Sequence, residues 1–366
     1  MQERTWAGRA LRLTALTGAM ALAAAACGGG GATTAPSAAD PTLAPSADAS
    51  SPASAGPGDA LADVCAAGVE EGELVLWNNH SDEFKQVTDA FTAAYPGIEI
   101  ETLTLSPDDS AQRVLTESAG GRPPSADVIA GGLDIFKGLV DRGLVRQDID
   151  WVGLGVSPDV LHESNLVRIH RIALGLGYNT DNYSADDLPD TWEELLDPKW
   201  TGQVVTDPRG RPFDSLSLSW GEEQTLDYVQ RMKDTIAPLL IEGGTAGLVA
   251  VAGGEAAITT GGRSAETLEQ QAEGAPLDIK YMDVVTTIDN YDVVLNEAAH
   301  PNAAICFVTW FSTQGQDLYN EVEFKTNDSV PPDAPASAEV IAIETPEQSE
   351  AVQAIGDAIT EILVGN

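Results

Sequence analysis

Short apolar runs alternate with amphipathic segments through most of the chain. Residues 73–77 form an apolar run of strand length, and Phe84, Val87, Phe91 and Ala94 then fall on one face of a helix. The same alternation returns in residues 95–121, 126–143, 171–180, 202–220 and 255–274. Strands that alternate with helices predict right-handed βαβ units and mainly parallel sheets, so we expect an α/β fold.

The N-terminal 26 residues have a different pattern. Arg4, Arg9 and Arg12 precede an uncharged run at 13–26, which ends at Cys27. A basic segment followed by a short apolar one predicts a secretory signal, too short to span a bilayer as a mature helix. The segment resembles a bacterial lipoprotein signal, in which the cysteine is acylated and becomes the mature N-terminus, although Ala24 stands where that family prefers Leu. The alternative is an ordinary secretory signal with a cysteine nearby.

A low-complexity segment separates this signal from the rest of the chain. Every residue from 28 to 60 except Leu43 is Gly, Ala, Thr, Pro, Ser or Asp. Such a segment has almost nothing to bury, so ordering it would cost backbone entropy without return. We therefore expect residues 27–60 to be a disordered tether between an anchor on the outer face of the cell membrane and a folded body.

The chain is strongly acidic. Removing the signal takes away three arginines and one glutamate, so the net charge of −38 becomes −40. This balance argues against nucleic acid as a partner, because phosphate binding needs clustered Lys and Arg. It suits an extracytoplasmic monomer kept apart from its copies by charge repulsion. Local clusters of arginine become informative because cations are scarce.

Two cysteines remain once Cys27 is assigned to the lipid. An even pair in an exported protein predicts a disulfide between Cys65 and Cys306. The alternative is two small buried apolar residues.

Four junctions between a predicted strand and a predicted helix have the form of a ligand site. In open α/β sheets, ligands bind beyond the carboxyl ends of strands, next to helix N-termini. The junctions lie at 78–81, 130–134, 207–215 and 260–264. Glycine and serine also cap helices for purely structural reasons. The predicted ligand-binding residues are Asn79, His80, Ser81, Gly132, Arg209, Arg211, Ser215, Gly262, Arg263 and Ser264.

Several segments between about 71 and 330 carry a family resemblance. They are residues 72–101, 126–145, 177–208, 254–279 and 296–319, and the stretch YNTD…LPDTWEELLDPKWTGQV within the third is the most specific. In these segments the chain resembles the family 1 extracellular solute-binding proteins of ABC importers and is most similar to their ferric-iron-binding branch.

The resemblance implies a two-lobed, type II periplasmic-binding-protein-like fold with a hinge between the lobes. Lobe 1 would hold 61–175 plus 288–330, and lobe 2 would hold 176–287 plus 331–366 with the C-terminal helices. It also implies a small-molecule ligand, ABC permease and ATPase subunits as partners, and neither enzymatic activity nor a resident cofactor. Hinge closure around ligand is the switching mode of such proteins.

The iron-binding relatives raise a question about His80. In them, a histidine after the first strand joins a carboxylate and two adjacent tyrosines around Fe(III), and His80 falls close to that place. The tyrosines would follow residues 255–260, but this chain has Gly261, Gly262 and Arg263 there, and no Tyr-Tyr pair occurs anywhere. Tyr281 or Tyr291 would have to substitute. We therefore interpret His80 as a hydrogen-bonding cleft residue, with a structural role and a role as a metal ligand for transported Fe(III) as alternatives.

The arginines point to an anionic solute instead. Arg263 stands in the neighbourhood of the lost tyrosines, and Arg209 and Arg211 flank Gly210 at another junction. Guanidinium groups match carboxylate and phosphate oxygens bidentately. The pattern predicts a phosphonate, a phosphorylated polyol or a carboxylate as the solute. The alternative is that these arginines pair with the abundant acids.

Two rival functions remain open at this point. An exported hydrolase would use His80 with Asp82 or Asp134, although the chain has no G-x-S-x-G, P-loop, EF-hand loop or C-x-x-C motif. A lipid-anchored sensor would keep the two-lobed fold without transport.

Overall fold

A computed structural model describes residues 57–162, 165–328, 331 and 333–365. The predicted signal, Cys27 and the tether up to residue 56 lie outside the described residues. The first helix begins at Pro57, within the last residues of the tether predicted over 27–60. Among the described residues, no helix is both long enough and apolar enough to span a bilayer.

The described residues contain one mixed sheet of ten strands in the order β2-β1-β3-β9-β4-β7-β5-β6, with β10 paired to β9 and β8 paired to β4. The strands are β1 (Glu73–Asn78), β2 (Glu99–Thr104), β3 (Val128–Gly131), β4 (Val167–Asn179), β5 (Val204–Thr206), β6 (Leu239–Leu240), β7 (Ile258–Arg263), β8 (Leu277–Lys280), β9 (Val284–Val294) and β10 (Glu339–Ile341). The pairs β1–β2, β1–β3, β5–β6 and β5–β7 are parallel, as the alternating pattern predicts.

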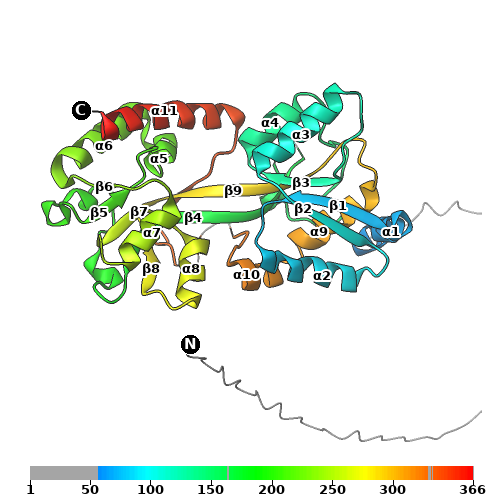
Figure 1. The fold of residues 1–366 in the computed structure, drawn as a ribbon, viewed down its shortest axis with the longest axis horizontal. Coiled ribbons are helices and arrows are strands. Elements are labelled where there is room, and N and C mark those ends of the chain that lie inside the picture. The colour runs from blue at the N-terminus through cyan, green and yellow to red at the C-terminus, as the bar shows by residue number, and fades with distance from the viewer. Residues whose placement is uncertain (1–56, 163–164, 329–330, 332, 366) are drawn as a thin grey trace, which may run out of the picture. The chain divides into compact units, whose positions relative to one another are not determined.

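Two long strands connect the two halves of this sheet. β4 and β9 pair antiparallel along the middle of the molecule, between the β1–β3 half, here called lobe 1, and the β5–β7 half, here called lobe 2 (Figure 1). Both strands run through from one half to the other. The lobe boundaries predicted at 175 and 288 therefore fall inside crossing strands.

Helices cover both faces of the sheet in lobe 1. They are α1 (Pro57–Glu71), α2 (Lys85–Ala94), α9 (Pro301–Ser312) and α10 (Gln316–Glu323), with α3 (Pro107–Ala119) and α4 (Leu133–Val140). Leu74 and Leu76 join the core that contains Phe307 and Phe311 of α9, whereas Trp77 joins the core that contains Phe136 of α4. Period-two alternation explains this division, because successive strand side chains point to opposite faces.

The two buried cysteines lie in the first of these cores. The structure joins Cys65 of α1 to Cys306 of α9, with 2.01 Å between the sulfurs and a sequence separation of 241. The covalent link ties the first described helix to a helix that follows the second crossing strand.

Lobe 2 has its own core around β5 and β7. Its helices are α5 (Phe213–Trp220), α6 (Glu222–Ile236), α7 (Gly244–Ala252), α8 (Ser264–Ala272) and the C-terminal α11 (Pro346–Val364). Phe213 of α5, Met232 of α6 and Ile359 of α11 pack together in it. Short 3₁₀ turns complete the chain: η1 (Asp82–Phe84), η2 (Pro158–Val160), η3 (Ala185–Asp187), η4 (Glu194–Leu196) and η5 (Pro198–Trp200). Pro198 begins η5 directly after η4, so these two turns do not form one continuous helix.

Candidate functional site

A cavity of 610 Å³ lies between the two lobes, and we call it the interlobe pocket. Lobe 1 contributes the start of α4, and the crossing strand β9 contributes Thr287, Ile288 and Asp289. Lobe 2 contributes the loop that follows β5 and the end of β7, and α11 lines the remaining side. The volume lies in the usual range for small-molecule sites.

Five of the ten predicted ligand-binding residues line this pocket. They are Gly132, Arg209, Arg211, Ser215 and Arg263. Two of them stand at helix starts, where ligands of open α/β sheets are expected: Gly132 is the N-cap of α4 and Arg263 is the N-cap of α8. The lining also includes Gly244 and Gly261, and a Cβ added at Gly244 would lie 2.7 Å from the carbonyl oxygen of Gly261.

A tight backbone contact positions the arginine loop. Gly210 has φ +99°, a conformation that favours glycine, and a Cβ added there would lie 3.1 Å from the Cα of Gly356 in α11. A Cβ added at Gly356 would lie 3.2 Å from the carbonyl oxygen of Arg209. The loop and α11 thus touch backbone to backbone, and the loop presents Arg209 and Arg211 on either side of this contact.

Each of the three pocket arginines faces a nearby acid. Arg209 Nη2 lies 2.7 Å from Asp207 Oδ2, and its Nε donates to Oδ1 at 3.1 Å. Arg263 Nη1 lies 2.7 Å from Glu266 Oε1. The alternative that the arginines pair with acids therefore holds for Arg209 and Arg263.

The contact of Arg211 with its acid is looser. Arg211 Nε lies 3.8 Å from Asp214 Oδ2, and the side chain of Arg211 is 53% exposed. Burial raises the pKa of the Asp214 carboxyl, although Arg211 opposes this. At Asp207, burial alone would raise the pKa, but the hydrogen bonds from Arg209 and from the Gly243 N–H outweigh it and lower the pKa.

Acids outnumber arginines in the pocket, which the sequence did not predict. Five aspartates line it: Asp134, Asp207, Asp214, Asp289 and Asp357. Asp134 stands two residues after the pair Gly131–Gly132, at the end of a predicted strand, and this position could have indicated a pocket residue. Nothing in the sequence around Asp357 indicated a pocket, because its place depends on how α11 crosses the molecule.

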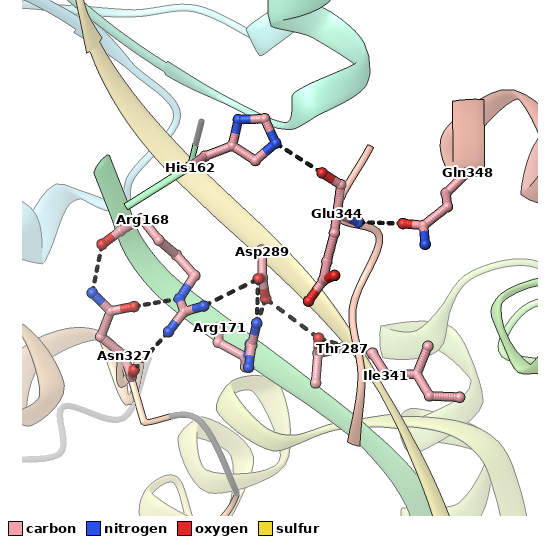
Figure 2. Close-up of polar contacts among 9 residues, drawn as sticks. All are labelled: His162, Arg168, Arg171, Thr287, Asp289, Asn327, Ile341, Glu344 and Gln348. Carbon is pink, nitrogen blue, oxygen red and sulfur yellow. Dashed lines mark hydrogen bonds and ion pairs between the residues drawn. The ribbon is translucent and has the colours of Figure 1, made fainter. Parts of the chain in front are cut away.

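Asp289, which lines the pocket, forms ion pairs with two buried arginines of β4 (Figure 2). It accepts hydrogen bonds from Arg171 Nε at 2.7 Å and from Arg171 Nη2 at 2.6 Å, and Arg168 Nη1 lies 3.6 Å away. Arg168 also donates to Asn327 Oδ1 at 2.8 Å. Asp289 and Tyr291 are shared with a second cavity of 420 Å³ beside the pocket. The crossing strands therefore carry a charged cluster at the point where the lobes join.

The structure places His80 in the core of lobe 1, away from the interlobe pocket. Its ring stacks on Phe84 with 4.0 Å between centroids, and Tyr319 Oη lies 3.3 Å from His80 Nδ1. Burial, with a smaller contribution from Lys325, lowers the pKa of His80 to about 3, so the ring is neutral. The cleft role predicted for His80 is replaced by a structural one because α10, with Tyr319, covers the end of β1.

The neighbours of His80 also have structural places. The Asn79 side chain is exposed, and Ser81 caps η1 and donates from Oγ to Glu323 Oε1 at 2.6 Å. Neither residue lines the pocket.

Gly262 and Ser264 border the pocket without lining it. A Cβ on Gly262 would lie 2.6 Å from the backbone nitrogen of Gly177, so this glycine lets β4 and β7 approach. Ser264 Oγ accepts from the Ala173 N–H at 3.2 Å. Both residues therefore serve the contact between lobe 2 and the crossing strand.

The described residues hold no group of three or more His, Cys, Asp or Glu side chains that is arranged to bind a metal ion. The pocket lining has no histidine, and its tyrosine is Tyr291. Burial raises the pKa of Tyr291, which disfavours the phenolate that Fe(III) needs. Tyr281, the other candidate, does not line the pocket.

Comparisons with known proteins agree with this architecture. The family described as "Bacterial extracellular solute-binding protein" matches residues 77–317. The curated "Iron uptake protein A1" of Synechocystis sp. (strain ATCC 27184 / PCC 6803 / Kazusa) is 27% identical over 207 residues. That alignment covers 52% of this chain and 54% of the relative, so the chain matches about half of the relative's length.

Solved structures show the same fold. Iron-bound HitA from Pseudomonas aeruginosa has a TM-score of 0.61 at 20% identity, covering 78% of this chain and 99% of that one. Trichodesmium IdiA (FutA) with iron and citrate has a TM-score of 0.61 at 17% identity, covering 80% and 98%. AfuA from Actinobacillus pleuropneumoniae with fructose-6-phosphate has a TM-score of 0.56 at 17% identity, covering 79% and 97%.

These neighbours are two-lobed periplasmic binding proteins, as the sequence resemblance predicted. Such proteins are transport components without enzymatic activity, which removes the hydrolase alternative. The family match covers more than half of the chain. The chain therefore belongs to the bacterial extracellular solute-binding proteins.

Proposed function

We propose that this protein captures a small, anion-bearing solute in the interlobe pocket by hinge closure and delivers it to an ABC importer. The observation that carries the proposal is the origin of the pocket walls. Lobe 1, lobe 2 and the crossing strand β9 all contribute to one cavity. Rotation of the lobes about the crossing strands would therefore change the size of the cavity, as solute capture requires.

Two arginines support an anionic group on the solute. Arg211 reaches its acid at 3.8 Å and remains 53% exposed, so most of its donor capacity is available. Arg263 uses one nitrogen on Glu266. Gly132 adds the start of α4, where backbone N–H groups favour negative charge. A phosphonate, a phosphorylated polyol or a carboxylate fits these donors.

Iron is the second candidate, because the curated relative is named an iron uptake protein. The pocket chemistry opposes it, since the aspartates of the lining are not among any group of three or more His, Cys, Asp or Glu arranged to bind a metal ion in the described part of the chain, and the pKa of the lining tyrosine, Tyr291, is raised. Fe(III) would have to enter as a complex with an anion.

The proposal includes a membrane anchor. An acylated Cys27 and a tether up to residue 56 would hold a monomer at the outer face of the cell membrane, within reach of the permease. The support for the anchor is the sequence pattern alone.

A thermal-shift screen followed by calorimetry tests the pocket. Phosphonates, sugar phosphates, carboxylates, thiamine, polyamines and Fe(III) form the panel. Arg263→Ala should weaken binding of the best solute about ten-fold or more, since a charged hydrogen bond contributes about 1.5–3 kcal/mol and each 1.4 kcal/mol is one decade.

Arg146→Ala is the matched control. Arg146 pairs with Asp148 at 2.8 Å and does not line the pocket, so this change should leave binding intact. A coloured Fe(III) complex that survives Arg263→Ala would favour the iron candidate over the anion-bearing solute.

A further inference from the structure

The C-terminal helix α11 forms one wall of the interlobe pocket. The chain reaches this wall by pairing β10 in parallel with β9, where Thr287 Oγ1 donates to the Ile341 carbonyl at 3.1 Å. It then meets the segment before β4, where His162 Nε2 lies 2.8 Å from the Glu344 carbonyl oxygen (Figure 2). From there α11 begins with a capping box of Thr345 and Gln348 and returns over α5 and α6 (Figure 1).

The far half of α11 is fixed to lobe 2. Ile355, Ile359 and Leu363 are buried in the lobe 2 core. Lys233 of α6 donates to the carbonyl oxygens of Ile362 at 2.6 Å and of Gly365 at 2.7 Å. Together with the contact between Gly210 and Gly356, these interactions hold α11 and the arginine loop as one body, so the wall keeps its place relative to Arg211.

Three polar residues of α11 lie four residues apart and line the pocket. Ser349, Gln353 and Asp357 share one helix face by this spacing. Gln353 and Asp357 are exposed, and neither side chain has a hydrogen-bond partner within the described part of the chain. Ile355, Ile359 and Leu363 of the same helix are buried in the lobe 2 core, whereas the buried Val352 and Gly356 line the pocket together with the polar residues.

The pocket lining therefore combines donors with acceptors. Arg211 and Arg263 offer guanidinium donors, and Asp357 and Gln353 offer acceptors on the α11 wall, with Asp134 of lobe 1 also in the lining. A solute with several anionic groups would bring negative charge against these aspartates. Hydroxyl groups donate to carboxylates and exchange hydrogen bonds with an amide, so they suit the acceptors of α11.

We propose that the solute is a polyhydroxylated molecule with one anionic group, phosphate or carboxylate, and that Gln353 and Asp357 select it by binding its hydroxyls. This inference rests on the proposed function and deepens it. The anionic group would contact Arg211 and Arg263, while α11 would distinguish hydroxylated from hydroxyl-free anions. Asp357 and Gln353 are then specificity-determining residues on the C-terminal helix, which packs on lobe 2.

The test compares hydroxylated probes with hydroxyl-free ones by calorimetry. Fructose 6-phosphate and gluconate are the hydroxylated probes for the two anionic groups, and propylphosphonate and succinate are their counterparts. We expect at least one hydroxylated probe to bind ten-fold or more tightly than its counterpart. Asp357→Asn and Gln353→Ala should each weaken binding of that probe about ten-fold. Arg263→Ala should weaken binding of both hydroxylated and hydroxyl-free probes.

Glu361→Gln is the matched control, an equal charge change one turn along α11 at an exposed position outside the lining. It should leave every affinity unchanged. Equal binding of hydroxyl-free probes, or binding that depends on Arg263 but not on Asp357 and Gln353, overturns the inference and leaves the proposed function standing. If no probe and no solute of the wider panel binds, both fall.

Discussion

Removing the charge of Asp289 should destabilise the junction of the two lobes. This carboxylate is 4% exposed and accepts two hydrogen bonds from Arg171, whose side chain is 11% exposed, with Arg168 at 3.6 Å and 8% exposed. Asp289→Asn keeps the shape, removes the charge and turns an amide NH₂ toward guanidinium groups. Breaking a buried ion pair by removing one partner typically costs about 3–5 kcal/mol.

The loss should appear as a lower free energy of unfolding in urea at pH 7. Asp148→Asn is the control, because it makes the same chemical change at a pair with Arg146 in which Asp148 is 74% exposed. Exposed ion pairs contribute at most about 1 kcal/mol, so Asp148→Asn should lower the free energy of unfolding by no more than that. If Asp289→Asn costs no more than Asp148→Asn, the buried cluster does not hold the crossing strands together and the reasoning is wrong.

Three further predictions concern other parts of the chain. The pKa of His80 is about 3 in the folded protein against an ordinary value of 6.5, so the stability from its neutral ring is complete above pH 6.5 and is lost as the pH falls toward 3, at about 1.4 kcal/mol per pH unit. Urea unfolding at pH 7 and pH 5 should therefore show a smaller loss for His80→Gln than for the wild type, and equal losses would contradict this. Gly210→Ala, which combines a positive φ with the contact at Gly356, should cost about 1–3 kcal/mol and more than Gly254→Ala, which has φ +78° and open space. Cys27→Ser should release the protein from membranes into the medium, and a mutant that stays membrane-bound would place the anchor elsewhere.

Local patterns predicted the elements well because both sheet halves are built from contiguous strand–helix units. The apolar run at 73–77 became β1, and the periodic face of Phe84, Val87 and Phe91 is buried in lobe 1. The glycine and arginine junctions after β5 and β7 reached the pocket because strand ends in parallel sheets share one edge. These predictions needed only local spacing.

Contacts between distant segments could not be predicted in the same way. His80 follows a strand just as Gly132 does, but Tyr319, 239 residues later, covers it. No local signal distinguishes a strand end that opens to a pocket from one that another helix closes. Whether Asp357 lines the pocket likewise depends on the path of α11 across lobe 2. The sequence around Asp357 does not reveal this path.

A crystal structure with the best solute from the screen would show where that solute binds. We expect it in the interlobe pocket, in contact with lobe 1 at Gly132 or Asp134 and with lobe 2 at Arg263 in the same complex. A solute held by one lobe alone, or bound beside His80, would contradict it.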